Sequence, residues 1–250
     1  MLEIERLSPT GARVLAELGL GRPRDLLRFS GGHVVRSTPH RETLEVATAT
    51  GSCYLKRYRP GAGGVGRIAR MQAPAAVEWQ RLDQMRAAGI RVPDGLAAVW
   101  SDRGDREPSA VLLEGVAATP LDEALRNPGA GDAEAWLRRF LPPAIRRLHQ
   151  AGFWHRDLYA AHLLVAGFQG EPTLIDVARV RPAGRLSRRR RVKDLAALHF
   201  SLAPLLRPSL LLALLLGYLE LPGLTSGSRR LLRSVLRKSA RISRHAPKYG

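Results

Sequence analysis

Residues 154–165 place several side chains that transfer protons or bind metal ions between short apolar runs. Asp157 and His162 lie within this stretch, and Asp176 follows the apolar residues 173–175. Carboxylates and imidazoles act as general bases, and both bind metal ions. If the chain brings them together, such groups suit the chemistry of a metal-bound phosphate. The types and spacing of these residues therefore predict a phosphoryl-transfer site.

A β-hairpin is the element that would bring the three groups together. Residues 163–165 and 173–175 are short β-prone runs, and the glycines and the proline between them are typical of a hairpin connection. Asp157 and His162 lie on the loop that enters the first strand, and Asp176 lies at the exit of the second. In an antiparallel pair this entrance and this exit share one end, so we expect the three side chains to converge.

The same stretch resembles the catalytic core of the protein-kinase-like fold, in which a His-Arg-Asp loop supplies a base and a later aspartate binds metal. The resemblance implies that Asp157 accepts the proton of the attacking hydroxyl. It also implies that Asp176 holds a Mg²⁺ ion that bridges the phosphates of ATP. The His-Arg-Asp triplet is followed by Leu158-Tyr159, and the second strand ends in Leu-Ile-Asp.

His162 stands where protein kinases carry a metal-binding asparagine. This difference, with Tyr159 and the Leu-Ile-Asp ending, makes the stretch more similar to the lipopolysaccharide kinase family, the Kdo/WaaP and InaA-like group. Because a neutral imidazole prefers softer metals than Mg²⁺, His162 is either a metal ligand or a residue that orients phosphate. Each residue also has a structural alternative: Asp157 as a turn or helix cap, and His162 as a hydrogen-bonded loop histidine. His155 is expected to be packed and hydrogen-bonded.

The first half of the chain resembles the small lobe of a kinase. Residues 33–35, 43–48 and 53–58 alternate like strands and are separated by turn residues. Lys56, on the third run, stands where the fold uses an ammonium group to hold the α- and β-phosphates. Glu78, on the following helix, is its expected partner. The alternatives are a surface lysine and a solvated helical carboxylate.

Two further strands, residues 96–100 and 110–113, should complete this lobe. Glu114 would then begin the hinge, whose backbone groups meet adenine, although an ordinary strand-end carboxylate is an equal alternative. A Gly-x-Gly-x-x-Gly sequence occurs at Gly61, Gly63 and Gly66. It has no second parallel strand after it, so we interpret it as a loop and not as a dinucleotide site.

The second half reads as mainly helical. The first helix expected there spans residues 133–150, with an apolar stripe and a kink or interruption at Pro142 and Pro143. Further helices are expected at 194–206, within the apolar residues 208–221, and from 228, where the sequence is basic. The apolar helix is interpreted as a core helix, with a membrane-docking patch as the alternative. Asp194 is expected either to hydrogen-bond the catalytic loop or to cap its helix. The apolar run in 208–221 is too short to span a bilayer. No Ala-Pro-Glu sequence follows Asp176, so a regulated activation segment is not expected.

The net charge of +18 is concentrated in two segments. Residues 185–193 carry six positive side chains, and residues 229–248 carry eight. Such clusters predict a polyanionic neighbour, either phosphorylated glycolipid or an anionic membrane face, with a merely solvated surface as the alternative. Nucleic acid is a weaker reading, since no aromatic residues interleave with the charges to stack bases. The single cysteine, Cys53, and an acidic start without a secretory pattern predict a cytoplasmic protein.

We therefore predict an α+β, two-lobed protein-kinase-like fold over residues 1–250, with an antiparallel small lobe to about residue 114 and a mainly helical large lobe after it. The predicted activity is phosphorylation of a sugar hydroxyl of the lipopolysaccharide inner core, Kdo or heptose, with ATP and Mg²⁺. The enzyme would act peripherally at the inner face of the inner membrane. The alternatives are a protein or small-molecule kinase on the same fold, and an inactive pseudokinase or basic scaffold.

Overall fold

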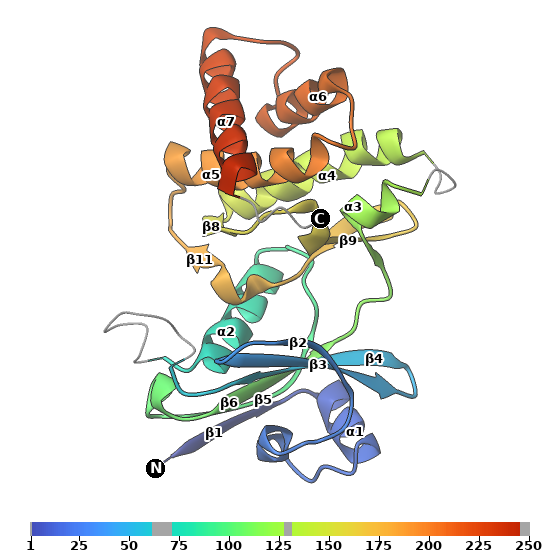
Figure 1. Ribbon diagram of the computed structural model, residues 1–250, viewed down its shortest axis with the longest axis vertical. Coiled ribbons are helices and arrows are strands. Elements are labelled where there is room, and N and C mark those ends of the chain that lie inside the picture. The colour runs from blue at the N-terminus through green and yellow to red at the C-terminus, as the bar shows by residue number, and fades with distance from the viewer. Residues whose placement is uncertain (1, 62–71, 128–131, 246–250) are drawn as a thin grey trace. The chain divides into compact units, whose positions relative to one another are not determined.

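A computed structural model describes residues 2–61, 72–127 and 132–245, so Gly63 and Gly66 of the glycine-rich sequence lie outside the described residues. The chain divides into two compact units. The first comprises Met1–Gln84 and Pro93–Ala117, and the second comprises Met85–Val92 and Ala118–Gly250. Each unit is coloured by sequence position in Figure 1.

The first unit is built on a six-stranded antiparallel sheet of order β1-β5-β6-β4-β3-β2. The strands are β1 (Glu3–Leu7), β2 (His33–Ser37), β3 (Arg41–Thr48), β4 (Gly51–Tyr58), β5 (Gly95–Ser101) and β6 (Ser109–Glu114). The five strands expected from the sequence are confirmed. β1 was not expected from the sequence, because three of its five residues are charged. It lies at the edge of the sheet, where charged side chains are common.

Helices cover both faces of this sheet (Figure 1). These helices are α1 (Pro9–Glu17), which begins at the Ser8 N-cap, the 3-10 helix η1 (Pro23–Leu27), and α2 (Pro74–Ala87), which carries Glu78. Successive side chains of a strand point to opposite faces. Cys53 and Leu55 of β4 therefore join the apolar core with α1, while Lys56 points to the opposite face and contacts α2.

The second unit is mainly helical, which with the first unit confirms the α+β class. Its α-helices are α3 (Leu121–Ala124), α4 (Ala133–Gln150), α5 (Arg188–Leu202), α6 (Pro208–Leu219) and α7 (Ser226–His245). Its short strands are β7 (Thr119–Pro120), β8 (Phe153–Trp154), β9 (Leu163–Ala166), β10 (Gln169–Leu174) and β11 (Arg181–Pro182). The 3-10 helices η4 (Ala160–His162) and η5 (Val177–Arg179) lie next to the hairpin strands in sequence.

The predicted hairpin is present as β9 and β10, but its connection is tighter than expected. Only Gly167 and Phe168 lie between the strands, and both have positive φ, 58° and 56°. A two-residue turn of this kind matches the twist of the strands it joins. Phe168 adopts this conformation with its ring buried against Trp136, at 5.6 Å between ring centroids, and this packing offsets the backbone strain.

Of the kink or interruption expected at Pro142 and Pro143, the interruption is wrong, since α4 runs through both residues. Its apolar stripe is buried on both sides of the prolines, including Leu137, Leu141 and Ile145. Gly217 of α6 allows a close approach, because a Cβ there would lie 3.3 Å from the Pro142 side chain. Tertiary packing thus compensates for the missing backbone donors.

The expected start of the next helix at Asp194 is also wrong. α5 begins at Arg188, with the Ser187 hydroxyl accepting from the Arg190 N–H, so the arginine run forms its first turn. Ser187 is a favourable N-cap, and this cap sets the start of the helix ahead of the arginines. Asp194 consequently lies inside the helix and not at its cap.

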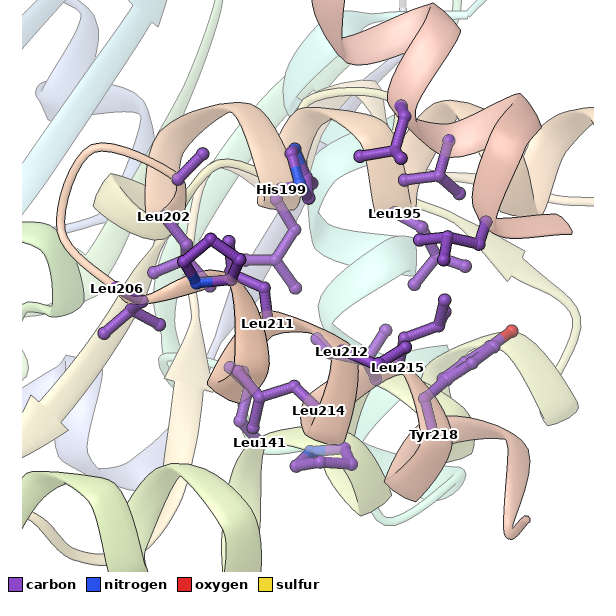
Figure 2. Close-up of a pocket in the computed structure, with 18 residues that line it drawn as sticks. Leu141, Leu195, His199, Leu202, Leu206, Leu211, Leu212, Leu214, Leu215 and Tyr218 are labelled. Atoms are coloured by element: carbon purple, nitrogen blue, oxygen red, sulfur yellow. The ribbon is translucent and has the colours of Figure 1, made fainter. Parts of the chain in front are cut away.

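Helices α4, α5, α6 and α7 enclose an apolar cavity of about 450 Å³ (Figure 2). Leu141 of α4, Leu198 of α5 and Leu215 of α6 contribute to its wall. The apolar α6 is thus a core helix, as predicted, with Leu210, Leu214 and Leu215 buried. Among the described residues, no helix has both the length and the apolar character needed to cross a bilayer.

The contact between α1 and β5 gives a test of the fold. A Cβ on Gly11 would lie 1.8 Å from the Leu96 carbonyl oxygen, and this backbone atom cannot move aside cheaply. Gly11→Ala should lower the free energy of unfolding by about 2 kcal/mol, because overpacking outweighs the better helix propensity of alanine. Urea denaturation measures the change. Gly223→Ala, which meets no atom within 4 Å, is the matched control and should change stability by less than about 0.5 kcal/mol.

Candidate active site

Within the first unit, Lys56 and Glu78 form a buried ion pair. The Lys56 Nζ donates to Glu78 Oε1 at 2.6 Å, and the Tyr58 hydroxyl donates to Glu78 Oε2. The Lys56 side chain is 11% exposed and that of Glu78 is fully buried. Burying an ion pair is costly unless the remaining polar atoms are also hydrogen-bonded, and Tyr58 meets that need for Glu78. The predicted pairing is therefore present, and the role of the pair toward phosphate stays a prediction.

The expected hinge has fewer free backbone donors than the sequence suggested. Glu114 ends β6 with an exposed side chain, and its N–H donates to the Asp94 carbonyl at 2.9 Å. The Gly115 N–H donates to the Ser52 carbonyl at 2.8 Å. Within the described chain, the next N–H, that of Val116, makes no such bond. A ligand that meets backbone here would therefore find its donor at Val116.

In the second unit, the buried carboxylate of Asp194 holds the loop that carries Asp157. Its Oδ2 accepts the His155 N–H at 2.8 Å, and its Oδ1 accepts the Arg156 N–H at 2.9 Å. His149 lies 3.2 Å from Oδ2 on the other side. The loop-binding role predicted for Asp194 is thus confirmed. These bonds hold Arg156 at a φ of 77°, a conformation that a non-glycine residue adopts only when its surroundings enforce it.

The β9–β10 hairpin brings His162 and Asp176 together, as the antiparallel pairing predicted. His162 Nε2 lies 4.0 Å from Asp176 Oδ2, and the Ile175 N–H donates to the His162 carbonyl at 3.0 Å. The His162 Nδ1 is 2.7 Å from the Asp157 carbonyl oxygen. Because a carbonyl only accepts, Nδ1 must carry the proton. In the neutral ring Nε2 then presents a lone pair on the side of Asp176.

This donor set fits a metal ion that also binds phosphate oxygens. Mg²⁺ commonly takes one or two protein carboxylates and completes its shell with water and phosphate. Asp176 supplies a carboxylate and His162 a free imidazole nitrogen, oriented by a second hydrogen bond in the way that metal-binding histidines usually are. Within the described residues, no group of three or more His, Cys, Asp or Glu side chains could hold a metal ion. A metal ion at Asp176 and His162 would therefore take its other ligands from water and phosphate.

Arg179 is a site residue that the sequence did not reveal. It ends η5, three residues after Asp176, and its Nη1 lies 2.7 Å from Asp157 Oδ2. The Asp157 side chain is 18% exposed and that of Arg179 is 56% exposed. The guanidinium of Arg179 thus pairs directly with the carboxylate of the candidate base. Only its position three residues beyond Asp176 could have signalled this role.

His155 is the most buried titratable group near this loop. Its ring is fully buried and lies over His162, at 6.1 Å between ring centroids. Neither ring nitrogen has a hydrogen-bond partner among the described residues, so the expected hydrogen bond is made by its backbone alone. Desolvation lowers the pKa of His155 below its ordinary value, and His162 acts in the same direction, against the carboxylates of Asp194, Asp176 and Asp157.

A pH-dependent stability follows from the lowered pKa of His155. Below a pH of about 6.5 the unfolded chain binds a proton that the folded chain does not bind. The free energy of unfolding should therefore fall with decreasing pH, by up to about 1.4 kcal/mol per pH unit for this group. His155→Phe should flatten the slope between pH 6.5 and 5, measured by urea denaturation at each pH. His40→Phe, at an exposed position, is the control; an unchanged slope for His155→Phe would contradict the assignment.

Comparison with known proteins agrees with this geometry. The family described as "Lipopolysaccharide kinase (Kdo/WaaP) family" matches residues 28–217. A curated relative, the lipopolysaccharide core heptose(I) kinase WaaP of Pseudomonas aeruginosa, is 28% identical over 207 residues, which cover 72% of this chain and 73% of the relative. The protein of the same name from Escherichia coli is 27% identical over 198 residues, with 72% and 74% covered.

A solved structure of WaaP in complex with acyl carrier protein shares the fold. It superposes with a TM-score of 0.69 at 24% sequence identity and covers the whole of both chains. The protein-kinase-like fold predicted from the sequence is thereby confirmed. The family match and the two curated relatives confirm the predicted class of enzyme, a phosphotransferase with an alcohol acceptor. By the match of its sequence over residues 28–217, the chain belongs to the lipopolysaccharide kinase (Kdo/WaaP) family.

Proposed function

We propose that this protein transfers the γ-phosphate of ATP to a hydroxyl of a heptose in the lipopolysaccharide inner core. Heptose is chosen over Kdo because both curated relatives are named as heptose(I) kinases. The proposal is supported by the position of His162, whose Nε2 lies 4.0 Å from Asp176 Oδ2 and whose Nδ1 bonds the backbone carbonyl of Asp157. These are the groups that phosphoryl transfer needs, a base and a metal-binding pair.

Asp157 is the general base in this proposal. Its carboxylate accepts the proton of the acceptor hydroxyl as the oxygen attacks the γ-phosphorus. Arg179 lies 2.7 Å from the same carboxylate and restricts its orientation. The bonds from Asp194 to the loop fix the direction of Asp157, and such positioning supplies much of the catalysis in phosphoryl transfer.

Each unit supplies its own groups for the nucleotide. In the first, Lys56, oriented by Glu78, holds the α- and β-phosphates, and the free N–H of Val116, next to Glu114, meets adenine. In the second, Asp176 and His162 would hold Mg²⁺, which neutralises charge on the phosphates when bound. His162 Nε2 is suited to either of its two predicted roles, because its lone pair is fixed by the bond from Nδ1.

The place of action is the cytoplasmic face of the inner membrane, where an anionic lipid surface would bind the protein peripherally. The support is the basic side of α7, on which Arg233, Arg237, Arg241 and Arg244 are all exposed. These positions recur every three or four residues and so share one side of the helix. Each basic residue near an anionic leaflet contributes about 1 kcal/mol, so several together give reversible binding.

Asp157→Asn tests the role of the base. The variant should lose at least about 100-fold in turnover with core glycolipid, because an amide cannot accept the proton. Binding of ATP with Mg²⁺, measured as thermal stabilisation, should stay near that of the parent protein. Lys56→Met is the matched comparison and should instead lose most of the stabilisation by ATP. Full activity of Asp157→Asn would refute the assignment, and no stabilisation of the parent by ATP would favour the scaffold alternative.

We also propose that this chain binds an acyl carrier protein, the partner with which the WaaP of the solved structure is in complex. The observation that favours this second property is the apolar cavity among α4, α5, α6 and α7 (Figure 2). Its volume of about 450 Å³ and its leucine-rich wall suit the acyl chain that such a carrier holds.

Filling the cavity tests this second property. Ala203 lines it, so Ala203→Phe should abolish the preference for an acylated over an unacylated carrier protein, measured by calorimetry. Ala240→Phe, at an exposed position on α7, is the control and should keep the preference. Equal binding of both carrier forms by the parent protein would contradict a role for the acyl chain.

A further inference from the structure

Three positive side chains lie against a single indole ring beside the loop that carries Asp157. The charged ends of Arg156, Arg190 and Lys193 lie 5.4, 5.5 and 5.0 Å from the centroid of the Trp154 ring. All three are half-buried. A cation over an aromatic face is attracted by the ring, and the contact also restricts its long side chain. Trp154 therefore brings three cations to one ring and restricts their positions.

Two further arginines extend this cluster. Arg181 of β11 is the direct strand partner of Trp154 in β8. Arg179 and Arg181, together with desolvation as the largest cause, lower the pKa of Arg156, while Asp157 acts in the opposite direction. The five cations thus come from four elements, namely the catalytic loop, η5, β11 and α5, and they act on one another electrostatically.

The carboxylates nearby pair with none of the three cations that lie against Trp154. Asp194 is already bound by two backbone N–H groups and lies 3.2 Å from His149, and Asp157 is paired with Arg179. Within the described residues, Arg156, Arg190 and Lys193 form no ion pair with an acid.

The first turn of α5 adds to the excess of positive charge. It carries four arginines and no acid, where the positive end of the helix dipole disfavours cations. Arg190 and Lys193 are three residues apart and share one side of α5, which directs both charges to Trp154. This arrangement costs stability and leaves donors without acceptors, as expected of a site that is built for an anion.

We propose that Arg156, Arg190 and Lys193, which together we call the Trp154 cation site, bind a carboxylate or phosphate group of the acceptor glycolipid. The inference rests on the proposed function and names how its acceptor is recognised. Guanidinium groups bind carboxylate and phosphate through paired hydrogen bonds, and Arg156 directly precedes the base Asp157 in the chain. An acidic group held there fixes the sugar hydroxyl next to Asp157. The inner core sugar Kdo is itself an acid, so the acceptor carries such a group.

The test compares acceptor kinetics and acceptor binding in the full chain. Arg190→Gln/Lys193→Gln should raise KM and Kd for a deacylated, water-soluble core oligosaccharide at least tenfold, while KM for ATP changes less than twofold. Removing the acidic groups from the acceptor should have the same effect on the parent protein. A carboxyl-reduced and a dephosphorylated oligosaccharide, used separately, identify which group binds.

A control variant separates the proposed site from a general effect of positive charge. Arg185→Gln/Arg189→Gln removes two exposed charges from the same segment and should leave KM for both substrates and Kd for the acceptor within twofold of the parent values. Unchanged acceptor KM and Kd in the Arg190/Lys193 variant would overturn the Trp154 cation site. An equal effect of both double variants would also overturn it, in favour of non-specific attraction. If the parent phosphorylates no core acceptor, the proposed function fails, and the Kd comparison still decides the site. Lys193→Gln alone serves if the double variant does not fold.

Discussion

The site in the second unit depends on one buried carboxylate, that of Asp194. A carboxylate without solvent is stable only if other groups supply hydrogen bonds, and here the backbone N–H groups of His155 and Arg156 do so. The same two bonds fix the loop on which Asp157 lies. The bonds that stabilise the buried charge are therefore also the bonds that position Asp157, the proposed base.

This network continues away from the loop. His149 lies between Asp194 and Tyr218, with its Nδ1 2.9 Å from the Tyr218 hydroxyl and its Nε2 3.2 Å from Asp194. Burial raises the pKa of Tyr218, so its hydroxyl stays protonated and donates to His149 at neutral pH. Since Asp194 only accepts, the neutral ring then carries its proton on Nε2. Helices α4, α5 and α6 thus hold the catalytic loop through a chain of directional bonds, and a buried network of this kind specifies one geometry.

Positive charge around the loop lies in two separate groups. Arg179 is paired with Asp157, whereas Arg156, Arg190 and Lys193 have aromatic contacts and no acid partner among the described residues. The arginines of α7 are exposed and form a third group at the surface. The last two groups are those that we propose bind the acceptor and the membrane.

The sequence by itself determined five of the six strands of the sheet, and the hairpin, because local periodicity and turn residues depend on neighbours along the chain. The Lys56–Glu78 and Asp194 contacts were expected only from the resemblance of the His-Arg-Asp stretch and its surroundings to the kinase fold, and the family from that same resemblance. Only the tertiary structure decided that α4 continues through Pro142, since packing from α6 outweighs the local preference of proline. It also decided the tautomer of His162, the pairing of Arg179 with Asp157, and the placing of two α5 cations on Trp154. These contacts join segments that are distant in sequence, or groups whose direction depends on the folded loop, so no local pattern encodes them.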